Sequence, residues 1–360
     1  MLRNIKCKAV SIEKYLPFYI INPVRIVAGV VLAILLWSCS SNTDTEKYQN
    51  NRNNILNVKD KIQEIDFKDV ITGRFSSLFI INDYLLITDG RSYENLLNVF
   101  DKNTFNHISS FIEQGQGPGE IANMGFTGIN EDDNVIYISD HGKQRIFEYK
   151  LDSALNNPLY LPTEKMIMNN TQFPQRYKYI NDTLSMGVMI EPTGNSGFNH
   201  SVAKFNISTG EVKTMPYKNP KIDMKRVCFD LSMEHGIYVE CYHFQDLISI
   251  IDIDGNLICN IYGKQIDIST KNRLRYYSKV IILNDKIITT YGEGKNLYSD
   301  TENGTPTQFL IFNINGDYIQ TLETEYHIMD FCYDKDNNRI ILHLDAEIQF
   351  AYLELDGIIQ

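Results

Sequence analysis

The chain has 360 residues, 11% of them aromatic, and a formal net charge of −11. This excess of acidic side chains argues against electrostatic binding to nucleic acid or to anionic membrane surfaces, because both attract clusters of Lys and Arg. Six cysteines in a chain of this length are too few for a fold held together by disulfides. We therefore expect a globular protein with no nucleic-acid partner.

The first 39 residues have the order of an export signal. Residues 3–25 hold five Lys or Arg against one Glu, and the uncharged run Ile26–Trp37 follows. A basic segment, a short apolar segment and a small residue at the cleavage point are typical of secretory signals. The sequence Leu36-Trp37-Ser38-Cys39 resembles the lipobox of bacterial lipoproteins. By that resemblance, residues 1–38 are a lipoprotein signal peptide, and Cys39 carries the lipid that attaches the protein to the outer membrane of the cell envelope, on its periplasmic or outer side.

A transmembrane anchor is the alternative interpretation of the apolar run. Its twelve residues would span roughly 18 Å as a helix, which is less than the roughly 30 Å of a membrane's hydrocarbon core. Residues 40–46, which follow the run and the cysteine, contain no Lys or Arg, so this flank does not fit a stop-transfer segment. The signal peptide is therefore the favoured interpretation.

Residues 39–60 are predicted to form a flexible tether. Ser, Asn, Thr, Asp and Lys dominate this stretch, and polar segments of that kind bury too little apolar surface to fold by themselves. Beyond it, short runs rich in Tyr, Ile, Val, Phe and Thr alternate with turns of Asn, Asp and Gly. This pattern is typical of β-strands, so a folded β domain is expected over residues 61–360.

A pair of strand patterns recurs six times along this domain. The first follows a turn and lies at 82–88, 133–139, 181–187, 235–239, 284–290 and 336–342. The second precedes a turn and lies at 99–103, 148–152, 204–210, 251–256, 311–317 and 352–357. Six repeats of this pair of strand patterns predict an all-β fold, a six-bladed β-propeller of four-stranded antiparallel blades. The blades are expected over Phe75–Ile112, Phe126–Pro162, Gln175–Tyr217, Asp230–Gly263, Tyr276–Thr324 and Ile328–Leu355.

The sixth repeat leaves no room for a fourth strand before the last residue of the sequence. A strand from the start of the domain must then complete the last blade and close the ring. Lys61–Phe67 alternates polar and apolar residues, as a half-buried strand does. We expect this N-terminal segment to pair with the last blade.

The second repeat carries the most specific motif. Gly115–Glu120, Asn134–Asp140 and Gln144–Tyr149 resemble the glycine-rich entry and the two strands of an NHL-type propeller repeat. Together with the lipobox, residues 60–357 resemble the TolB-like six-bladed propeller lipoproteins common in bacteroidetes. The resemblance implies the fold and the location, and most members of that family have no assigned biochemical function.

Motifs for nucleotide, metal or nucleophilic chemistry do not emerge. Gly115, Gly117 and Gly119 have the spacing GxGxG with Pro118 between them, which differs from the GxGxxG of dinucleotide sites. The turns after Asp252 and Asp334 lack the sixth-position Gly and the twelfth-position Glu of a calcium loop. None of the seven histidines stands in a metal-binding pair. We expect no metal and no cofactor.

The cysteines of the folded domain favour buried free thiols, with a disulfide as the alternative. Besides Cys39, the residues concerned are Cys228, Cys241, Cys259 and Cys332. None of them has CxxC spacing, and Cys241 and Cys259 lie in apolar strand patterns.

Propeller topology indicates where a ligand would bind. Within each blade the second-to-third strand loops open on one face of the ring, together with the crossings between blades, and long loops on a rigid scaffold often bind ligands. On this face we expect the binding residues Arg91, Tyr93, His141, Lys143, Tyr242 and His243. The longest such loops are expected over Glu191–Asn199 and Gly292–Thr307. Asp140 and Arg145 are interpreted as structural residues of the repeat.

Three functions are compatible with these features. The favoured hypothesis is a monomeric, lipid-anchored binding module for an envelope glycan, peptide or protein. The alternative is an extracytoplasmic enzyme, a lyase or hydrolase, with its site at the channel mouth, which would rest on fold analogy alone. A scaffold subunit of an envelope complex is the third possibility.

Overall fold

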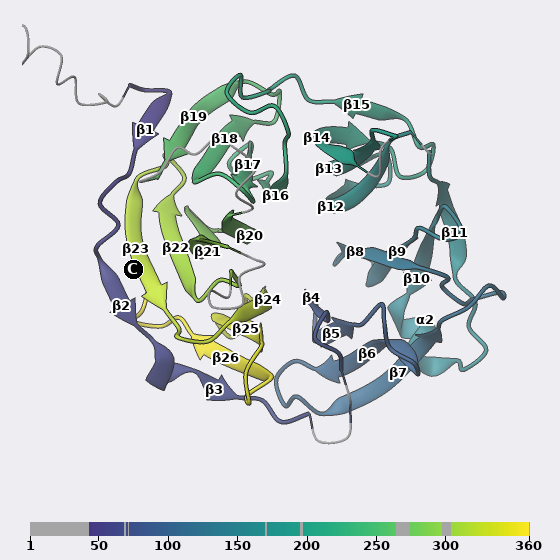
Figure 1. The fold of residues 1–360 in the computed structure, drawn as a ribbon. Coiled ribbons are helices and arrows are strands. Elements are labelled where there is room, and N and C mark those ends of the chain that lie inside the picture. The colour runs from purple at the N-terminus through teal and green to yellow at the C-terminus, as the bar shows by residue number, and fades with distance from the viewer. Residues whose placement is uncertain are drawn as a thin grey trace, which may run out of the picture. The chain divides into compact units, whose positions relative to one another are not determined.

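The computed structural model describes residues 43–67, 70, 72–169, 171–194, 197–263, 274–296 and 304–359. Their strands form six sheets arranged in a ring (Figure 1). The strands nearest the centre are Ser77–Ile81, Met124–Asn130, Phe173–Asn181, Val227–Ser232, Leu274–Leu283 and Ile328–Asp334. The six-bladed propeller predicted from the repeats is therefore confirmed. Residues 1–38, expected to be a signal peptide, and Cys39 lie outside the described residues. No helix among those described is long and apolar enough to cross a membrane.

The first three blades follow one another in sequence. Blade 1 consists of β4 (Ser77–Ile81), β5 (Tyr84–Thr88), β6 (Asn95–Asp101) and β7 (His107–Glu113). Blade 2 consists of β8 (Met124–Asn130), β9 (Val135–Asp140), β10 (Arg145–Lys150) and β11 (Thr163–Ile167), with the short helix α2 (Leu151–Asn156) between the last two strands. Blade 3 consists of β12 (Phe173–Asn181), β13 (Leu184–Pro192), β14 (Phe198–Phe205) and β15 (Val212–Thr214).

The last three blades complete the ring. Blade 4 consists of β16 (Val227–Ser232), β17 (Ile237–Tyr242), β18 (Leu247–Asp252) and β19 (Leu257–Tyr262). Blade 5 consists of β20 (Leu274–Leu283), β21 (Lys286–Asn296), β22 (Gln308–Asn313) and β23 (Tyr318–Glu323). Blade 6 consists of β24 (Ile328–Asp334), β25 (Arg339–Leu344), β26 (Phe350–Glu354) and the N-terminal strand β3 (Gln63–Glu64).

Asparagine and glycine set the tight turns inside the blades. Between the first and second strands, Asn82, Asn134, Asn284 and Asn338 adopt φ values of 49°, 52°, 50° and 44°. Asn enters this left-handed region at lower cost than other side chains, apart from Gly. The turn residues that marked the repeats in the sequence are thus the residues whose backbone conformation makes the hairpins.

Closure of the ring occurs where the sequence predicts it. β3 pairs antiparallel with β26, with Glu64 opposite Ala351 and Gln63 opposite Tyr352. Only two residues of the expected Lys61–Phe67 strand are in the ladder, but Phe67 continues into the core between blades 6 and 1. Its ring centroid lies 5.0 Å from that of Phe350. The last blade is therefore held by both ends of the domain.

The expected flexible tether needs correction, because residues 43–60 pack on the propeller. β1 (Glu46–Tyr48) pairs in parallel with β19, and β2 (Ile55–Asn57) pairs in parallel with β23, each as a fifth strand. A one-turn 3₁₀ helix, η1 (Lys59–Lys61), leads from β2 to β3. Outer strands expose unpaired backbone groups that can accept another strand whatever its composition, so polarity alone misled the prediction. We call residues 43–61 the N-terminal strap.

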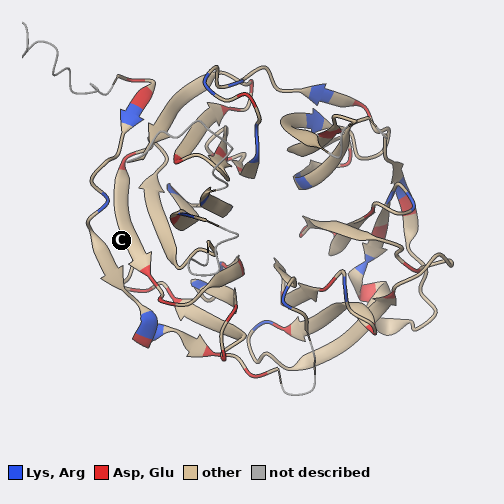
Figure 2. Ribbon diagram, viewed as in Figure 1, with Lys and Arg blue, Asp and Glu red and all other residues tan. Residues whose placement is uncertain are grey.

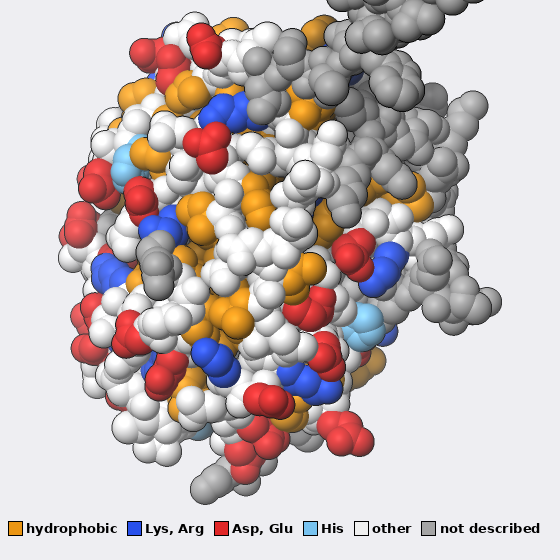
Figure 3. All heavy atoms as spheres, turned by 90° about the vertical axis from the view of Figure 1, so that its left-hand side faces the viewer, with side chains coloured by type: hydrophobic (Ala, Val, Ile, Leu, Met, Phe, Trp, Pro, Cys, Tyr) orange, Lys and Arg blue, Asp and Glu red, His pale blue; other side chains and the backbone are white. Residues whose placement is uncertain are grey.

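Figure 3 shows the side of the molecule that carries the strap, where apolar side chains lie among acidic and basic ones. The interior is dominated by apolar side chains between neighbouring blades, for example Phe309 and Phe331, whose ring centroids are 5.0 Å apart. Cys228, Cys241, Cys259 and Cys332 are buried free thiols, as expected. Charged residues concentrate in turns and at strand ends (Figure 2).

Candidate binding site at the channel mouth

Two faces of the propeller differ in the loops that they carry. The loops between second and third strands, such as 89–94 and 141–144, lie on the same face as the crossings between blades, because alternate strands run in opposite directions. We call this the site face. The two loops expected to be longest are partly strand, since β13 ends at Pro192 and β14 begins at Phe198, and β21 ends at Asn296. Residues 195–196 and 297–303 of these loops lie outside the described residues.

A central cavity of about 300 Å³ is lined by the first strands of all six blades. Lys178, Asp230 and Lys279 are among its lining residues, and two charged pairs join neighbouring inner strands there. Lys178 lies 3.0 Å from Asp230, and Lys279 lies 2.7 Å from Asp330. Each aspartate also accepts a hydrogen bond from a backbone N–H of the next blade. These charges therefore hold neighbouring blades together.

Two residues of the second repeat have structural roles. Asp140 is fully buried, and its carboxylate accepts hydrogen bonds from backbone N–H groups that include those of Ala122 and Gly142, at 2.8 and 2.9 Å. Lys143, expected to bind ligand, donates from Nζ to the carbonyl oxygens of Gly117 and Glu120, both at 2.8 Å. This ammonium therefore fixes the glycine-rich loop.

Three other expected residues are spread over blades 1 and 2. The Arg91 guanidinium lies over the ring of Phe75 at 4.3 Å, and the Tyr93 side chain is fully exposed. His141 is half-buried with its ring 5.4 Å from that of Phe173, and burial lowers its pKa. The described contacts do not join these three side chains into one site.

The expected residues Tyr242 and His243 lie where blades 3, 4 and 5 meet. Tyr242 is buried, and its hydroxyl donates to Glu240 at 3.3 Å. His243 Nδ1 donates to the carbonyl oxygen of Tyr277 at 2.7 Å. The His243 ring lies 6.3 Å from that of His200, a residue of β14 that the sequence did not single out.

A chain of contacts joins these residues across the blades. The His200 backbone N–H donates to the carbonyl oxygen of Lys225 at 3.2 Å, and the His243 N–H donates to that of Arg226 at 2.8 Å. The Arg226 guanidinium lies 3.9 Å over the ring of Phe198, and that ring stacks on His200 with centroids 5.3 Å apart. We call Arg176, His200, Arg226 and His243 the rim cluster.

Burial and positive charge together keep both imidazoles neutral. Burial, and next the nearby Arg226, lowers the pKa of His200 to about 3. Burial, followed by Arg275, lowers the pKa of His243 well below its usual value. Arg176 acts on both rings in the same direction. Because an efficient general base has a pKa near the working pH, these imidazoles are better suited to hydrogen bonding than to proton transfer.

A hollow opens beside the rim cluster. It has a volume of about 140 Å³ and lies between blades 3 and 4, with His200, Tyr242, Lys225, Glu191 and Asn219 among its lining residues. Arg176 lines the central cavity. The rim cluster therefore adjoins two hollows, one central and one between blades.

Sequence reasoning found His243 but missed Arg176, His200 and Arg226. His200 belongs to β14 and Arg176 to an inner strand, so neither lies in the loops that topology indicated. Arg226 directly precedes β16, in the crossing between blades 3 and 4, from which no residue was singled out. The one local signal was the basic pair Lys225-Arg226 just before an apolar strand. Within the described residues, no group of three or more His, Cys, Asp or Glu could hold a metal ion.

Comparisons with solved structures agree with the fold. A DUF4221 family member from Bacteroides vulgatus has a TM-score of 0.58 at 11% identity, covering 81% of this chain and 94% of that one. A protein described as exported, from Bacteroides fragilis, has a TM-score of 0.52 at 13% identity, covering 84% and 89%. A luciferin-regenerating enzyme has a TM-score of 0.54 at 6% identity, covering 81% and 94%. At these identities the likeness shows the fold alone.

No curated protein matches the chain. A model for a family described as a 6-bladed beta-propeller, DUF5128, matches residues 51–259. This match covers more than half of the sequence and begins inside the N-terminal strap. The chain therefore belongs to the DUF5128 family of six-bladed β-propellers.

Proposed function

We propose that this protein is an envelope lipoprotein of the TolB-like or NHL-like kind, which binds a glycan, peptide or protein partner at its site face. Cys39 would carry the lipid, by the resemblance of Leu36–Cys39 to a lipobox. The exported Bacteroides fragilis protein with a similar fold supports an extracytoplasmic location. Attachment through acyl chains suits an acidic protein, since lipid anchoring does not depend on attraction to anionic lipid.

The observation that carries the binding proposal is the rim cluster. His200 lines the hollow between blades 3 and 4, and Arg176 lines the central cavity. Arg226 and His243 lie next to His200. His200 and Arg226 are both buried. His200 Nε2 has no hydrogen-bond partner among the described residues, and the Arg226 guanidinium donates only to the Lys225 carbonyl oxygen there. Polar groups that converge on a hollow without satisfying one another are typical of ligand sites.

Array binding tests this function. Full-length protein in detergent micelles is applied to glycan and peptide arrays beside the double variant Arg176→Gln/Arg226→Gln and the control Lys213→Gln, which changes an exposed cation on β15. We expect one ligand class to bind the wild type and the control but not the double variant. Equal binding by all three proteins would remove the site from the rim cluster.

The anchor is tested separately. Mass spectrometry of the protein purified from membranes should find residues 1–38 removed and an acylated cysteine at position 39. An intact, unmodified N-terminus would refute the anchor and leave the binding proposal standing.

A further inference from the structure

Arg226 is a buried cation without a counter-ion. The residue is only 9% exposed. The guanidinium has five N–H donors, of which the described residues receive one hydrogen bond, from Nη1 to the carbonyl oxygen of Lys225 at 2.9 Å. No carboxylate among the described residues pairs with it, whereas the neighbouring Lys225 is paired with the buried Glu240. A cation with little access to water and no counter-ion is unfavourable, and the contact with Phe198 compensates only in part.

His200 adds a buried donor without a partner. Its Nδ1 accepts a hydrogen bond from the backbone N–H of Val227 at 3.1 Å. Because the ring is neutral, its hydrogen must then be on Nε2. Nε2 is buried and has no hydrogen-bond partner, and the residue is only 6% exposed. A native structure seldom leaves such a donor unsatisfied without a reason.

Arg176 increases the positive character of the same region. It comes from β12 at the site-face end of the central cavity, and no described acidic side chain forms an ion pair with it. Lys178 and Lys279, which line the same cavity, are each paired with an aspartate. Arg176 therefore adds a cation on the channel side of the rim cluster, whereas Glu191 and Asp223 are among the residues that line the adjoining hollow.

We propose that the rim cluster binds an oxyanion, namely a carboxylate, sulfate or phosphate group of the ligand. The inference rests on the proposed function, which places a ligand at the site face, and it names the chemical class that the cluster selects. The Arg226 guanidinium supplies the counter-charge in a fork that suits such groups. The Nε2–H of His200 supplies a neutral donor, and Arg176 adds charge from the channel side.

Anion titration of full-length protein tests the inference. Thermal unfolding is followed while sodium acetate, glucuronate, sulfate or phosphate replaces sodium chloride at constant ionic strength. We expect at least one of these oxyanions to raise the midpoint saturably, because ligands that bind only the folded state stabilise it. A rise in the midpoint with acetate or glucuronate would indicate that the ligand carries a carboxylate. A rise with sulfate or phosphate would indicate a sulfate or phosphate ester. A response no larger than that to chloride, for all four anions, would overturn the inference.

Three variants locate the effect. Arg226→Met should weaken binding of the active anion about tenfold or more, yet should unfold in chloride at the same temperature or higher, because it removes an unpaired buried charge. His200→Gln should weaken binding less. The control Lys213→Gln should behave as the wild type. Unchanged anion affinity in Arg226→Met would overturn the inference.

The two proposals fail in distinguishable ways. Anion binding that depends on Arg226, without any array ligand, would keep the oxyanion site and remove the binding-module function. An array ligand whose affinity is unchanged in Arg226→Met would keep the module and remove the oxyanion site.

Discussion

His200 and His243 illustrate how far a buried position can change the chemistry of one residue. Histidine ordinarily titrates close to neutral pH, but burial and neighbouring arginines keep both rings uncharged well below it. Each ring uses Nδ1 in a backbone contact, His200 as acceptor and His243 as donor. The two imidazoles therefore differ in what Nε2 presents, a hydrogen at His200 and a lone pair at His243.

Acid should destabilise the protein through these histidines. The folded-state pKa of His200 is about 3 and its ordinary value is 6.5, so the unfolded chain binds the proton first. Its contribution is complete above pH 6.5 and is lost as pH falls toward 3, by about 1.4 kcal/mol per pH unit. Urea unfolding at pH 7.5, 6.0 and 5.0 should show a smaller loss in His200→Gln. The exposed His107, changed to Gln, serves as the control and should leave the change of unfolding free energy with pH unaltered. An equal change with pH in all three proteins would contradict the assignment.

Arg52 is another residue whose chemistry depends on its buried position, but its charge is paired with a carboxylate. It lies in the N-terminal strap, is buried, and contacts Asp246 at 2.8 Å. The hydroxyls of Tyr277 and Tyr291 donate to the same carboxylate at 2.5 and 3.0 Å. This buried group adds to the apolar contacts of the strap, in which Val58 is fully buried and Tyr48 stacks on Tyr262.

Asp246→Asn should strongly destabilise the fold. Removing one partner of a buried ion pair leaves an uncompensated charge and costs about 3–5 kcal/mol. The matched control is Lys47→Gln, which removes the pair between Lys47 and the exposed Asp317 and should cost about 1 kcal/mol or less. Urea midpoints measure both. Similar losses in the two variants would show that the buried pair does not hold the strap.

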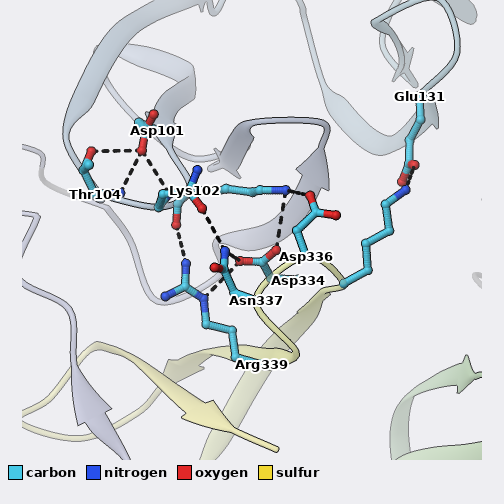
Figure 4. A network of polar contacts seen from close by, with 10 residues as sticks. Asp101, Lys102, Thr104, Glu131, Asp334, Asp336, Asn337 and Arg339 are labelled. Atoms are coloured by element: carbon cyan, nitrogen blue, oxygen red, sulfur yellow. Dashed lines mark hydrogen bonds and ion pairs between the residues drawn. The ribbon is translucent and has the colours of Figure 1, made fainter.

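At the scale of elements, hairpin turns connect the first and last blades. Figure 4 shows Lys102, from the turn after β6, directed toward Asp334 and Asp336 of blade 6, with Arg339 beside them. Lys102 Nζ lies 3.5 Å from the Asp334 carboxylate, and Arg339 Nε lies 3.0 Å from it. Arg339 also donates to the Lys102 carbonyl oxygen at 2.5 Å. Because Lys102 and Asp334 are almost completely buried, this network seals the closure on the face opposite the site face.

Lys102→Met should weaken the ring at that junction. The change keeps most of the side-chain volume but leaves Asp334 with one cation instead of two, so a loss of about 3 kcal/mol in unfolding free energy is expected. Lys335→Met removes an exposed pair with Glu131 on the same face and should cost about 1 kcal/mol or less. Chemical unfolding measures both, and the two variants should bind array ligands as the wild type does, because they lie on the opposite face. An equal, small loss in both would argue against a sealing role.

The whole molecule should unfold as one cooperative unit, and its thiols can report this. Burial raises the pKa of Cys332, Cys241 and Cys259, the last to about 11, and a thiol that is buried and protonated reacts slowly. In native protein whose Cys39 is acylated, a thiol reagent should on average label fewer than one of the four described cysteines per molecule. All four should react in urea, along the same curve as the loss of circular dichroism. Labelling of any one without denaturant would show local opening of its blade.

Much of the architecture follows from the sequence because its determinants are local. Alternating runs and Asn or Gly turns occur within a few residues of one another, so six repeats could be counted. The expected limits lie within a few residues of the observed strands, except that the second blade was expected to end at Pro162, before β11 begins at Thr163. The same count required a strand from the front of the domain to close the last blade, which β3 provides.

Other features were decided only by the tertiary structure, because their partners are distant along the chain. Arg52 finds its carboxylate 194 residues away, so a segment that is polar in sequence becomes a strap. His200, Arg226 and His243 are brought together only when blades 3 and 4 pack side by side. Residues that are close together in the sequence specify the turns and strands. Burial, pairing and the absence of a counter-ion depend on which distant side chains the closed ring brings into contact.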